Sequence, residues 1–414
     1  MSMTEGTDVR VAYKFYASGS MAANTEADTA SAPGASSGQI LRRVANTLAL
    51  QKRTFRSAEV RTDGQRPVPR HSGVIASGEL TGELSPGTWF PFFEAVLRDT
   101  ATAGVVLDET DLTSVTADSG TSKFTFAGGD PVALGLGVGM TFRFANLSTT
   151  ANNAQNFTIL SFGGTSNREV TVTPAPTTMG SDSAFTLTVP GKTTIVPATG
   201  RQKRLLAVEN YDEAQDLAEL FTEGRLSGFG INAGADGAVT VRFPITARNL
   251  KLFSGGSAPY FTSPGAVGVT PQGTAVNGLC MVGGTSLGTV TAFELQAEMT
   301  VDAQNVQGQQ FVPEIFLRPI TFSGSVTALF NGTSLYNSFV NEEQKDILFS
   351  VASSSAADAD LVSFFLPALV LGGHNKPVQG EGGQIVTIPF ECGIYTGSTA
   401  GVPASSIRIH DTAA

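Results

Sequence analysis

The sequence predicts a mainly β protein with a few short helices, two copies of one strand-and-helix module and a small inserted β-domain. Two internal resemblances support the duplication. SGELTGELSPGTWFPFF from Ser77 resembles SGSVTALFNGTSLYNSF from Ser323, and 323 minus 77 gives an offset of 246 without a gap. AVTVRFPI from Ala238 resembles QIVTIPFE from Gln384, and 386 minus 239 gives an offset of 147 for the aligned valines. A repeat of this kind indicates two copies of one structural module.

The two offsets differ by 246 minus 147, or 99 residues, so the first copy is expected to carry an insertion of about that size. The composition of residues 103–200 shifts to Thr, Ser, Gly and Asn. This stretch contains the runs KFTFAGG, MTFRFANL, FTILSF, REVTVTPAP and AFTLTVPG. Each run is rich in β-branched and aromatic residues and is bounded by turn residues, which is typical of strands. The insertion therefore reads as a separate β-domain.

Three stretches are expected to be helical: WFPFFEAVLRD, which has Pro86 and Thr88 at its start, ENYDEAQDLAELFTEG, and SLYNSFVNEEQKD, which Ser334 could cap. Helix aromatics such as Trp89, Phe90, Phe93, Tyr336 and Phe339 are more often core residues than contact residues. With 414 residues, 41% of them hydrophobic and 15% charged, the chain is long enough for two or three domains with proper cores.

The formal charge of −10 argues against a protein that grips nucleic-acid phosphates, because such a protein needs a basic face. Basic clusters occur at 41–43, 51–56 and 201–204, and solvated faces or subunit salt bridges explain them. Cys280 and Cys392 lie far apart without metal-ligand spacing, so free thiols are expected. The N-terminus has no apolar signal core and no window reaches the length of a membrane span, so we expect folding in a cytoplasm.

Catalytic signals are poor. The histidines, His71, His374 and His410, show no spacing that would give a metal two ligands on one face. The glycine loops lack the Lys and Ser/Thr of a phosphate cradle. Glu79 and Glu83 share a strand face, but at ~3.3 Å per residue they lie ~13 Å apart, too far for cooperative hydrolysis. We therefore expect no enzyme activity, no metal and no cofactor.

The order of the motifs resembles the major tail tube protein of long-tailed, non-contractile bacteriophages. The resemblance is carried by GQILRRVANTLALQKRTFRSAEV, HSGVIASGELTGELSPGTWFPFFEAVLRD, VNGLCMVGG, RPITFSGSVTALFNGTSLYNSFVNEEQKDILFSV and LVSFFLPALVLGGHNKPVQGEGGQIVTIPFE. It covers both repeat halves, about three quarters of the chain, and leaves out the insertion. No single motif is diagnostic, but their order is characteristic of tail tube modules.

The resemblance implies a β-sandwich module with a flanking helix, whose strands join those of neighbouring subunits into a β-barrel around an open lumen. The expected divisions are 1–102 and 201–255 for the first module, 103–200 for the exterior insertion and 256–414 for the second module. Families with one module per chain form hexameric rings, so two modules imply rings of three chains with pseudo-sixfold symmetry. The implied partners are further copies of the chain, a tape measure protein, a tail terminator and distal tail proteins, in a virion tail assembled in the host cytoplasm.

A conduit for DNA should repel phosphates, so carboxylates are the expected lumen lining and DNA is expected to pass without specific binding. The candidates alternate along strands in matching parts of the two modules: Glu79, Glu83, Glu294, Glu298 and Asp302. An ordinary solvated strand face explains the same alternation, and alternation does not say which face looks inward.

Long loops are the expected contacts between stacked rings. Residues 252–284 contain several Gly and Pro and the exposed-looking aromatics Tyr260 and Phe261. Residues 56–71 and the N-terminal arm through Gly38 are also expected to become ordered only in the tube. Two alternatives remain: a virion decoration or adhesin whose insertion binds a host glycan, and a hydrolase on a β-scaffold, which would need a nucleophile and base that the sequence lacks.

Overall fold

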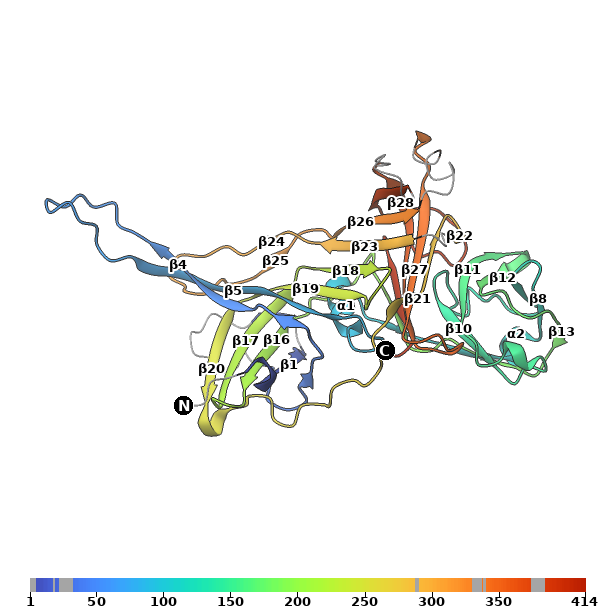
Figure 1. Cartoon of the computed structure of the whole chain (residues 1–414), viewed down its shortest axis with the longest axis horizontal. Helices are drawn as coiled ribbons and strands as arrows, with labels where there is room; N and C mark the ends of the chain where they lie inside the picture. Colours follow the sequence, from blue (N-terminus) through green and yellow to red (C-terminus); the bar gives the residue numbers. More distant parts are fainter. Residues whose placement is uncertain are drawn as a thin grey trace.

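The computed structural model describes residues 5–17, 19–21, 33–286, 290–329, 337, 340–373 and 384–414. Strands dominate this part of the chain, which confirms the predicted fold class (Figure 1). The helices of four or more residues within it are α1 (Phe90–Leu97) and α2 (Glu109–Leu112). Short 3-10 turns occupy Gly6–Asp8, Thr150–Asn152, Thr165–Asn167 and Gly255–Ser257.

A central antiparallel sheet runs through the whole body of the molecule. Its strands lie in the order β4 (Ala49–Phe55), β5 (Arg70–Glu83), β19 (Thr240–Ala247), β18 (Gly228–Gly234), β23 (Val290–Glu298), β26 (Thr321–Leu329) and β29 (Ile385–Cys392). The short strand β3 (Ala45–Asn46) also pairs with β5. This sheet joins the two halves of the sequence, because β18 pairs with β23 along its full length.

Each half of the sequence, residues 1–255 and 256–414, adds an outer sheet. In the first half its order is β2 (Gln39–Ile40), β1 (Val9–Phe15), β16 (Leu206–Asp212), β17 (Leu217–Leu226) and β20 (Asn249–Ser254). In the second half its order is β22 (Thr285–Ser286), β21 (Thr274–Val282), β27 (Lys345–Ala352), β28 (Leu361–Leu371), β30 (Arg408–Asp411), β15 (Lys192–Ile195) and β6 (Thr102–Ala103). Strands β15 and β6 belong to the first half of the sequence but join the outer sheet of the second. The outer sheets pack on the central sheet through one hydrophobic core that includes residues of both halves.

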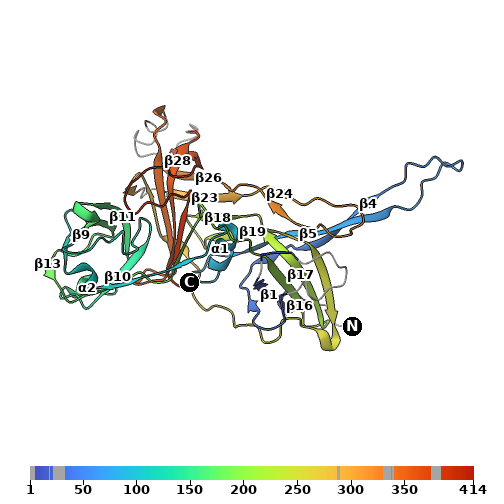
Figure 2. The same ribbon diagram turned by 180° about the vertical axis from the view of Figure 1, so that it is seen from behind.

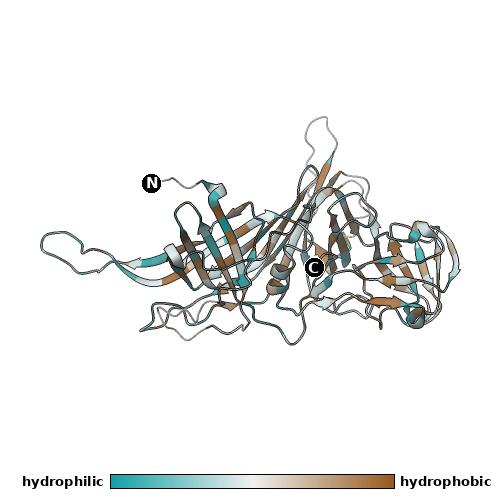
Figure 3. Ribbon diagram, turned by 90° about the horizontal axis from the view of Figure 1, so that it is seen from below, coloured by the Kyte–Doolittle hydropathy of each residue, from teal (hydrophilic) through white to brown (hydrophobic). Residues whose placement is uncertain are grey.

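Residues 105–190, which we name the inserted unit, form a separate sheet with its own core. The order of its strands is β13 (Met179–Asp182), β8 (Val115–Asp118), β9 (Lys123–Phe126), β12 (Glu169–Thr173), β11 (Phe157–Gly163), β10 (Thr141–Ala145), β14 (Thr186–Thr188) and β7 (Val106–Asp108). Every run predicted as a strand from the sequence is one. Hydrophobic residues gather on these strands and in the body of the molecule (Figure 3).

Helix α1 lies between the two halves, and its aromatic side chains fill the main core. The Phe93 ring lies 5.0 Å from the Phe229 ring, 5.2 Å from the Phe243 ring and 5.6 Å from the Phe364 ring of the second half. The Trp89 indole N–H donates to the Glu83 carbonyl at 2.9 Å. The expected helix and the expected burial of Trp89, Phe90 and Phe93 are confirmed.

Two projections leave the body at the end opposite to the inserted unit (Figures 1 and 2). The first is the hairpin of β4 and β5, whose residues 51–72 are all exposed except the half-buried Pro67. The second carries β24 (Val301–Asp302) and β25 (Phe316–Leu317). Val74 of β5 bridges to Phe311, which lies in the connection from β24 to β25, so the far end of the second projection lies beside the base of the first.

Several local predictions are wrong. ENYDEAQDLAELFTEG, residues 209–224, is not a helix but the β16–β17 hairpin. Asp212 caps its turn by accepting from the Gln215 N–H at 3.1 Å, and Asp216 takes a left-handed φ of 50°, which Asp tolerates better than most residues. The predicted loop 252–284 contains strand β21, and the N-terminal arm contains strand β1. Ser334, Tyr336 and Phe339 of the predicted third helix, residues 334–346, lie outside the described residues, as does His374. The end of that prediction is wrong, because Lys345 and Asp346 begin strand β27 (Lys345–Ala352).

Candidate functional site

The central sheet presents one polar face along its whole width. Pairing register places residues of successive strands in rows across the sheet, and rows two residues apart share a face. One row contains Thr81, Arg242, Gly230, Gln296, Ser323 and Glu391. The next row on the same face contains Glu83, Thr240, Asn232, Glu294, Ser325 and Pro389. Glu79 lies two residues before Thr81 on β5, and Glu298 lies two residues after Gln296 on β23, so both are on this same face.

The opposite face of the same strands is apolar and buried. Leu80, Phe243, Ile231, Leu295, Val326 and Ile388 all belong to the main core. An antiparallel sheet with one face on a core and the other solvated gives this alternation of apolar and polar residues. The register is therefore strongly specified, because a slip of one residue would exchange the two faces.

The polar face is acidic. Glu79, Glu83, Glu294, Glu298 and Glu391 supply five carboxylates, and the cation among the rows given above is Arg242. Its Nη1 lies 3.8 Å from Glu79 Oε2, with both side chains about two-fifths exposed. The guanidinium stem lies over Gly230, where an added Cβ would come within 2.5 Å of Arg242 Nε. The absence of a side chain at Gly230 thus lets Arg242 lie flat along the sheet.

The structure brings together four of the five predicted acids: Glu79, Glu83, Glu294 and Glu298. Asp302 lies apart from them, in the two-stranded pairing of β24 with β25, and is half-buried. Sequence reasoning missed Glu391, which stands beside Ser323 in the register. Its signal was present in the alternation of QIVTIPFE, since Thr387, Pro389 and Glu391 share the face opposite to Val386 and Ile388.

The aromatics predicted as exposed contacts have a different setting. Phe261 is fully buried, so its predicted exposure is wrong, and Tyr260 is half-buried. The N–H groups of both residues donate to the buried Glu209 carboxylate, at 2.5 Å from Tyr260 and 3.2 Å from Phe261. Burial raises the pKa of Glu209, while these N–H groups and Arg10 oppose that rise. The segment from 256 to 273 is therefore fastened to the first half.

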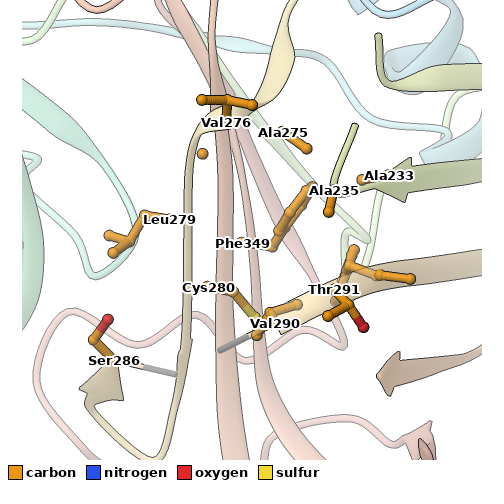
Figure 4. A pocket seen from close by; sticks show the side chains of 13 residues that line it. Ala233, Ala235, Ala275, Val276, Leu279, Cys280, Ser286, Val290, Thr291 and Phe349 are labelled. Atoms are coloured by element: carbon orange, nitrogen blue, oxygen red, sulfur yellow. The ribbon is translucent and has the colours of Figure 1, made fainter. Parts of the chain in front are cut away.

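A hollow of about 270 Å³ lies where β18, β21 and β23 meet (Figure 4). Alanines 233, 235 and 275 and Phe349 give it apolar walls, and Cys280 points into them. Burial raises the pKa of the Cys280 thiol to about 12, which keeps the thiol protonated and a poor nucleophile. The residues that line this hollow include no acid or base.

Within the described part of the chain, no group of three or more His, Cys, Asp or Glu side chains could hold a metal ion. The same residues contain no helix that is long and apolar enough to cross a membrane.

The fold is that of a mainly β protein whose central sheet exposes a polar, acidic face. The family model described as phage tail tube protein matches residues 6–392, and the chain belongs to this family. The resemblance found in the sequence is thereby confirmed at the level of the family. No curated protein matches the chain.

Proposed function

We propose that the chain polymerises as stacked rings into a phage tail tube, with the polar face of the central sheet lining the lumen through which DNA passes. Family membership supports a virion tail protein with a structural and non-catalytic role. The observation that carries the proposal is the acidic face on an uninterrupted sheet. Carboxylates on a lumen wall repel phosphates, so DNA can slide without breaking salt bridges.

The topology of the two halves supports a duplicated module. The strands correspond in chain order and in pairing as β1 to β21, β4 to β23, β5 to β26, β16 to β27, β17 to β28, β19 to β29 and β20 to β30. In each half one outer strand also pairs with a strand of the central sheet. β17 pairs with β19 through Arg225 and Leu226, and β28 pairs with β29 through residues 369–371.

The central sheet also repeats with a step of four strands. β23 lies four strands from β4, β26 four from β5, and β29 four from β19. Because neighbouring strands are antiparallel, strands four apart run in the same direction, as rotation about a tube axis requires. This step supports rings in which three chains supply six quasi-equivalent modules, with residues 103–200 as an insertion into the first.

The ends of the central sheet support closure by neighbouring copies. Among the described residues, β4 pairs with β5 alone, and β29 pairs with β26 and, through its last three residues, with β28. The outer edges of these strands expose backbone groups that invite pairing, and a closed barrel would satisfy them. Asp302 remains a predicted lumen residue, and Tyr260 and residues 56–71 remain predicted contacts between rings. By family resemblance the further partners are the tape measure, terminator and distal tail proteins, with assembly in the host cytoplasm.

The alternative of a glycan-binding adhesin receives no support from the inserted unit. Residues 105–190 contain neither Trp nor Tyr. Of their phenylalanines, those at 124, 126, 142, 144, 157 and 185 are buried in the unit's own core, and Phe162 is half-buried. Exposed aromatic rings are the usual means of stacking on a sugar, and the unit's exposed large hydrophobic residue is Val106.

The test is assembly of the purified chain followed by DNA binding. We expect hollow tubes in electron microscopy, with three chains and six similar lobes per ring, that do not retain duplex DNA in sedimentation. A variant with Glu83→Lys, Glu294→Lys and Glu298→Lys should still form tubes and should retain DNA, with binding that falls steeply as salt rises. The matched control reverses three exposed acids away from the polar face: Glu109 and Asp118 of the inserted unit, and Asp358 between β27 and β28.

Tubes of the control variant should behave as the wild type does. Retention of DNA by the control but not by the variant would place the lumen elsewhere. Compact particles that never form rings, even with tail-tip proteins present, would refute the tube.

A further inference from the structure

The outer sheet of each half carries buried apolar residues on both of its faces. One face packs into the main core through residues such as Val208 in the first half and Phe349 in the second. The other face points away from that core, and an apolar cluster on it is nevertheless buried. A buried apolar face needs a cover, and the two halves have different covers.

In the first half the cover is the segment that links the halves. Ala12 of β1, Ala207 of β16 and Leu220 of β17 are fully buried against Phe261, with Tyr260 beside them. The segment is held down by main-chain bonds as well, since the Gly265 N–H donates to the Gly38 carbonyl at 2.7 Å.

In the second half the cover is the inserted unit. The corresponding strands present Met281 of β21, Leu348 of β27 and Phe365 of β28, and these pack against Val138. Leu160 and Phe162 of the inserted unit pack at the margin of this cluster. The approach is close, because a Cβ added at Gly139 would come within 2.5 Å of the Phe365 Cβ.

Buried polar groups fix the inserted unit to the same sheet. His410 of β30 is fully buried; its Nδ1 accepts from the Thr141 N–H at 2.9 Å and its Nε2 lies 2.8 Å from the Pro190 carbonyl. The Ser363 hydroxyl donates to the Gly139 carbonyl at 2.7 Å, and Arg408 donates to the Val138 carbonyl at 2.6 Å. Satisfied buried polar contacts of this kind specify one docked geometry.

The strands at the root of the inserted unit belong to the second half as well. β15 pairs with β30, and β6 pairs with β15, although both lie in the part of the sequence that interrupts the first half. Asp99, just after α1, accepts from the Ile195 N–H at 2.9 Å. The insertion therefore crosses over from the first half to the second.

We propose that the inserted unit is a structural cover for the outer sheet of the second half, as Tyr260 and Phe261 are for the outer sheet of the first half. It is not a separate domain attached to the surface. The comparison of the halves rests on the proposed duplication, whereas the contacts do not. The experiment below measures the single chain, so its outcome is separate from that of tube formation.

The root of the inserted unit allows a clean deletion. The Gly104 N–H donates to the Gly191 carbonyl at 2.9 Å, and Ala103 is paired with Lys192. Removing residues 105–190 and joining Gly104 to Gly191 leaves a two-residue Gly-Gly hairpin turn. At a concentration at which the full chain is monomeric, we expect the deleted chain to self-associate in size-exclusion chromatography and to bind a hydrophobic dye, because Met281, Leu348 and Phe365 become exposed.

The decisive variant carries Met281→Thr, Leu348→Thr and Phe365→Thr. In the deleted chain these substitutions should remove the dye binding and restore the elution of the full chain at the same concentration. In the full chain the same substitutions should lower the Tm by roughly 5–10 °C, because they place hydroxyls and voids against Val138. Val370→Thr, at a site on β28 that is 47% exposed, is the control and should change neither chain.

A monodisperse deleted chain without the threonines would overturn the proposal. So would a full chain whose Tm is unchanged by them, which can be measured even if the deleted chain does not fold. Continued aggregation of the deleted chain with the threonines would also count against the proposal, because the exposed face would then not be its cause.

Discussion

His410 is a buried imidazole whose two nitrogens both have partners across the junction with the inserted unit. Burial lowers its pKa from 6.5 to about 4, the positive charges of Arg408 and Arg143 add to this effect, and the bond to the Pro190 carbonyl opposes it. The neutral ring is therefore the folded form, with Nδ1 as acceptor for Thr141. The next residue, Asp411, behaves in the opposite sense, since burial raises its pKa to about 7 although Gly87 and Ala413 donate N–H bonds to it.

His410 and Asp411 should change the unfolding free energy in opposite directions as pH falls. The unfolded chain protonates His410 as pH falls below about 6.5 and the folded chain does not until about 4, so the contribution of His410 is lost over that window. At ~1.4 kcal/mol per pKa unit the loss approaches about 3 kcal/mol. Protonation of Asp411 stabilises the folded chain over a similar window as pH falls, and this masks the effect of His410 in the wild type.

His410→Gln removes the titration while an amide can still donate and accept. We expect the difference in unfolding free energy between wild type and His410→Gln, measured by urea denaturation, to shrink as pH falls from about 6.5 to 4. A difference that stays constant with pH would show that His410 does not titrate in this way.

At the scale of elements, α1 is the most sensitive part of the core. Phe93 touches rings of both halves, and its removal would leave a cavity that rigid strands cannot fill. We expect Phe93→Ala to cost about 3–5 kcal/mol in unfolding free energy, and Phe55→Ala, at an exposed site on β4, less than about 0.5 kcal/mol. Chemical denaturation of both variants checks this, and equal losses would contradict the central place given to α1.

Elements with a local signal could be predicted from the sequence, and elements decided by distant pairing could not. The α1 aromatics follow a proline and a turn, and the strand runs of the inserted unit alternate clearly. In contrast, residues 209–224 have good helix formers such as Glu, Ala and Leu, yet β1 and β20 flank them as strands and override that propensity. The acids on β5 and β23 could be found from alternation, but their common face needed the β18–β23 pairing, which no local pattern encodes.

At the scale of the whole molecule, charge is distributed unevenly between the body and the first projection. Residues 51–72 contain six cations, Lys52, Arg53, Arg56, Arg61, Arg66 and Arg70, against Glu59 and Asp63, so six minus two gives +4 in a chain of −10. Arg61 and Asp63 form a local pair, which lowers the pKa of Asp63. A basic, exposed projection on an acidic body fits attraction to a further copy of the chain, which would serve stacking of rings.

Reversing charge on this projection should therefore weaken assembly without weakening the fold. We expect Arg56→Glu with Arg66→Glu to leave the Tm of the monomer within a degree or two, because both residues are exposed. Polymerisation, followed by sedimentation and electron microscopy, should fall and should lose its sensitivity to salt. Lys192→Glu with Arg201→Glu makes the same change of charge at exposed sites away from the projection and should polymerise as the wild type does. If both pairs of substitutions reduce assembly equally, net charge controls stacking and the projection has no specific partner.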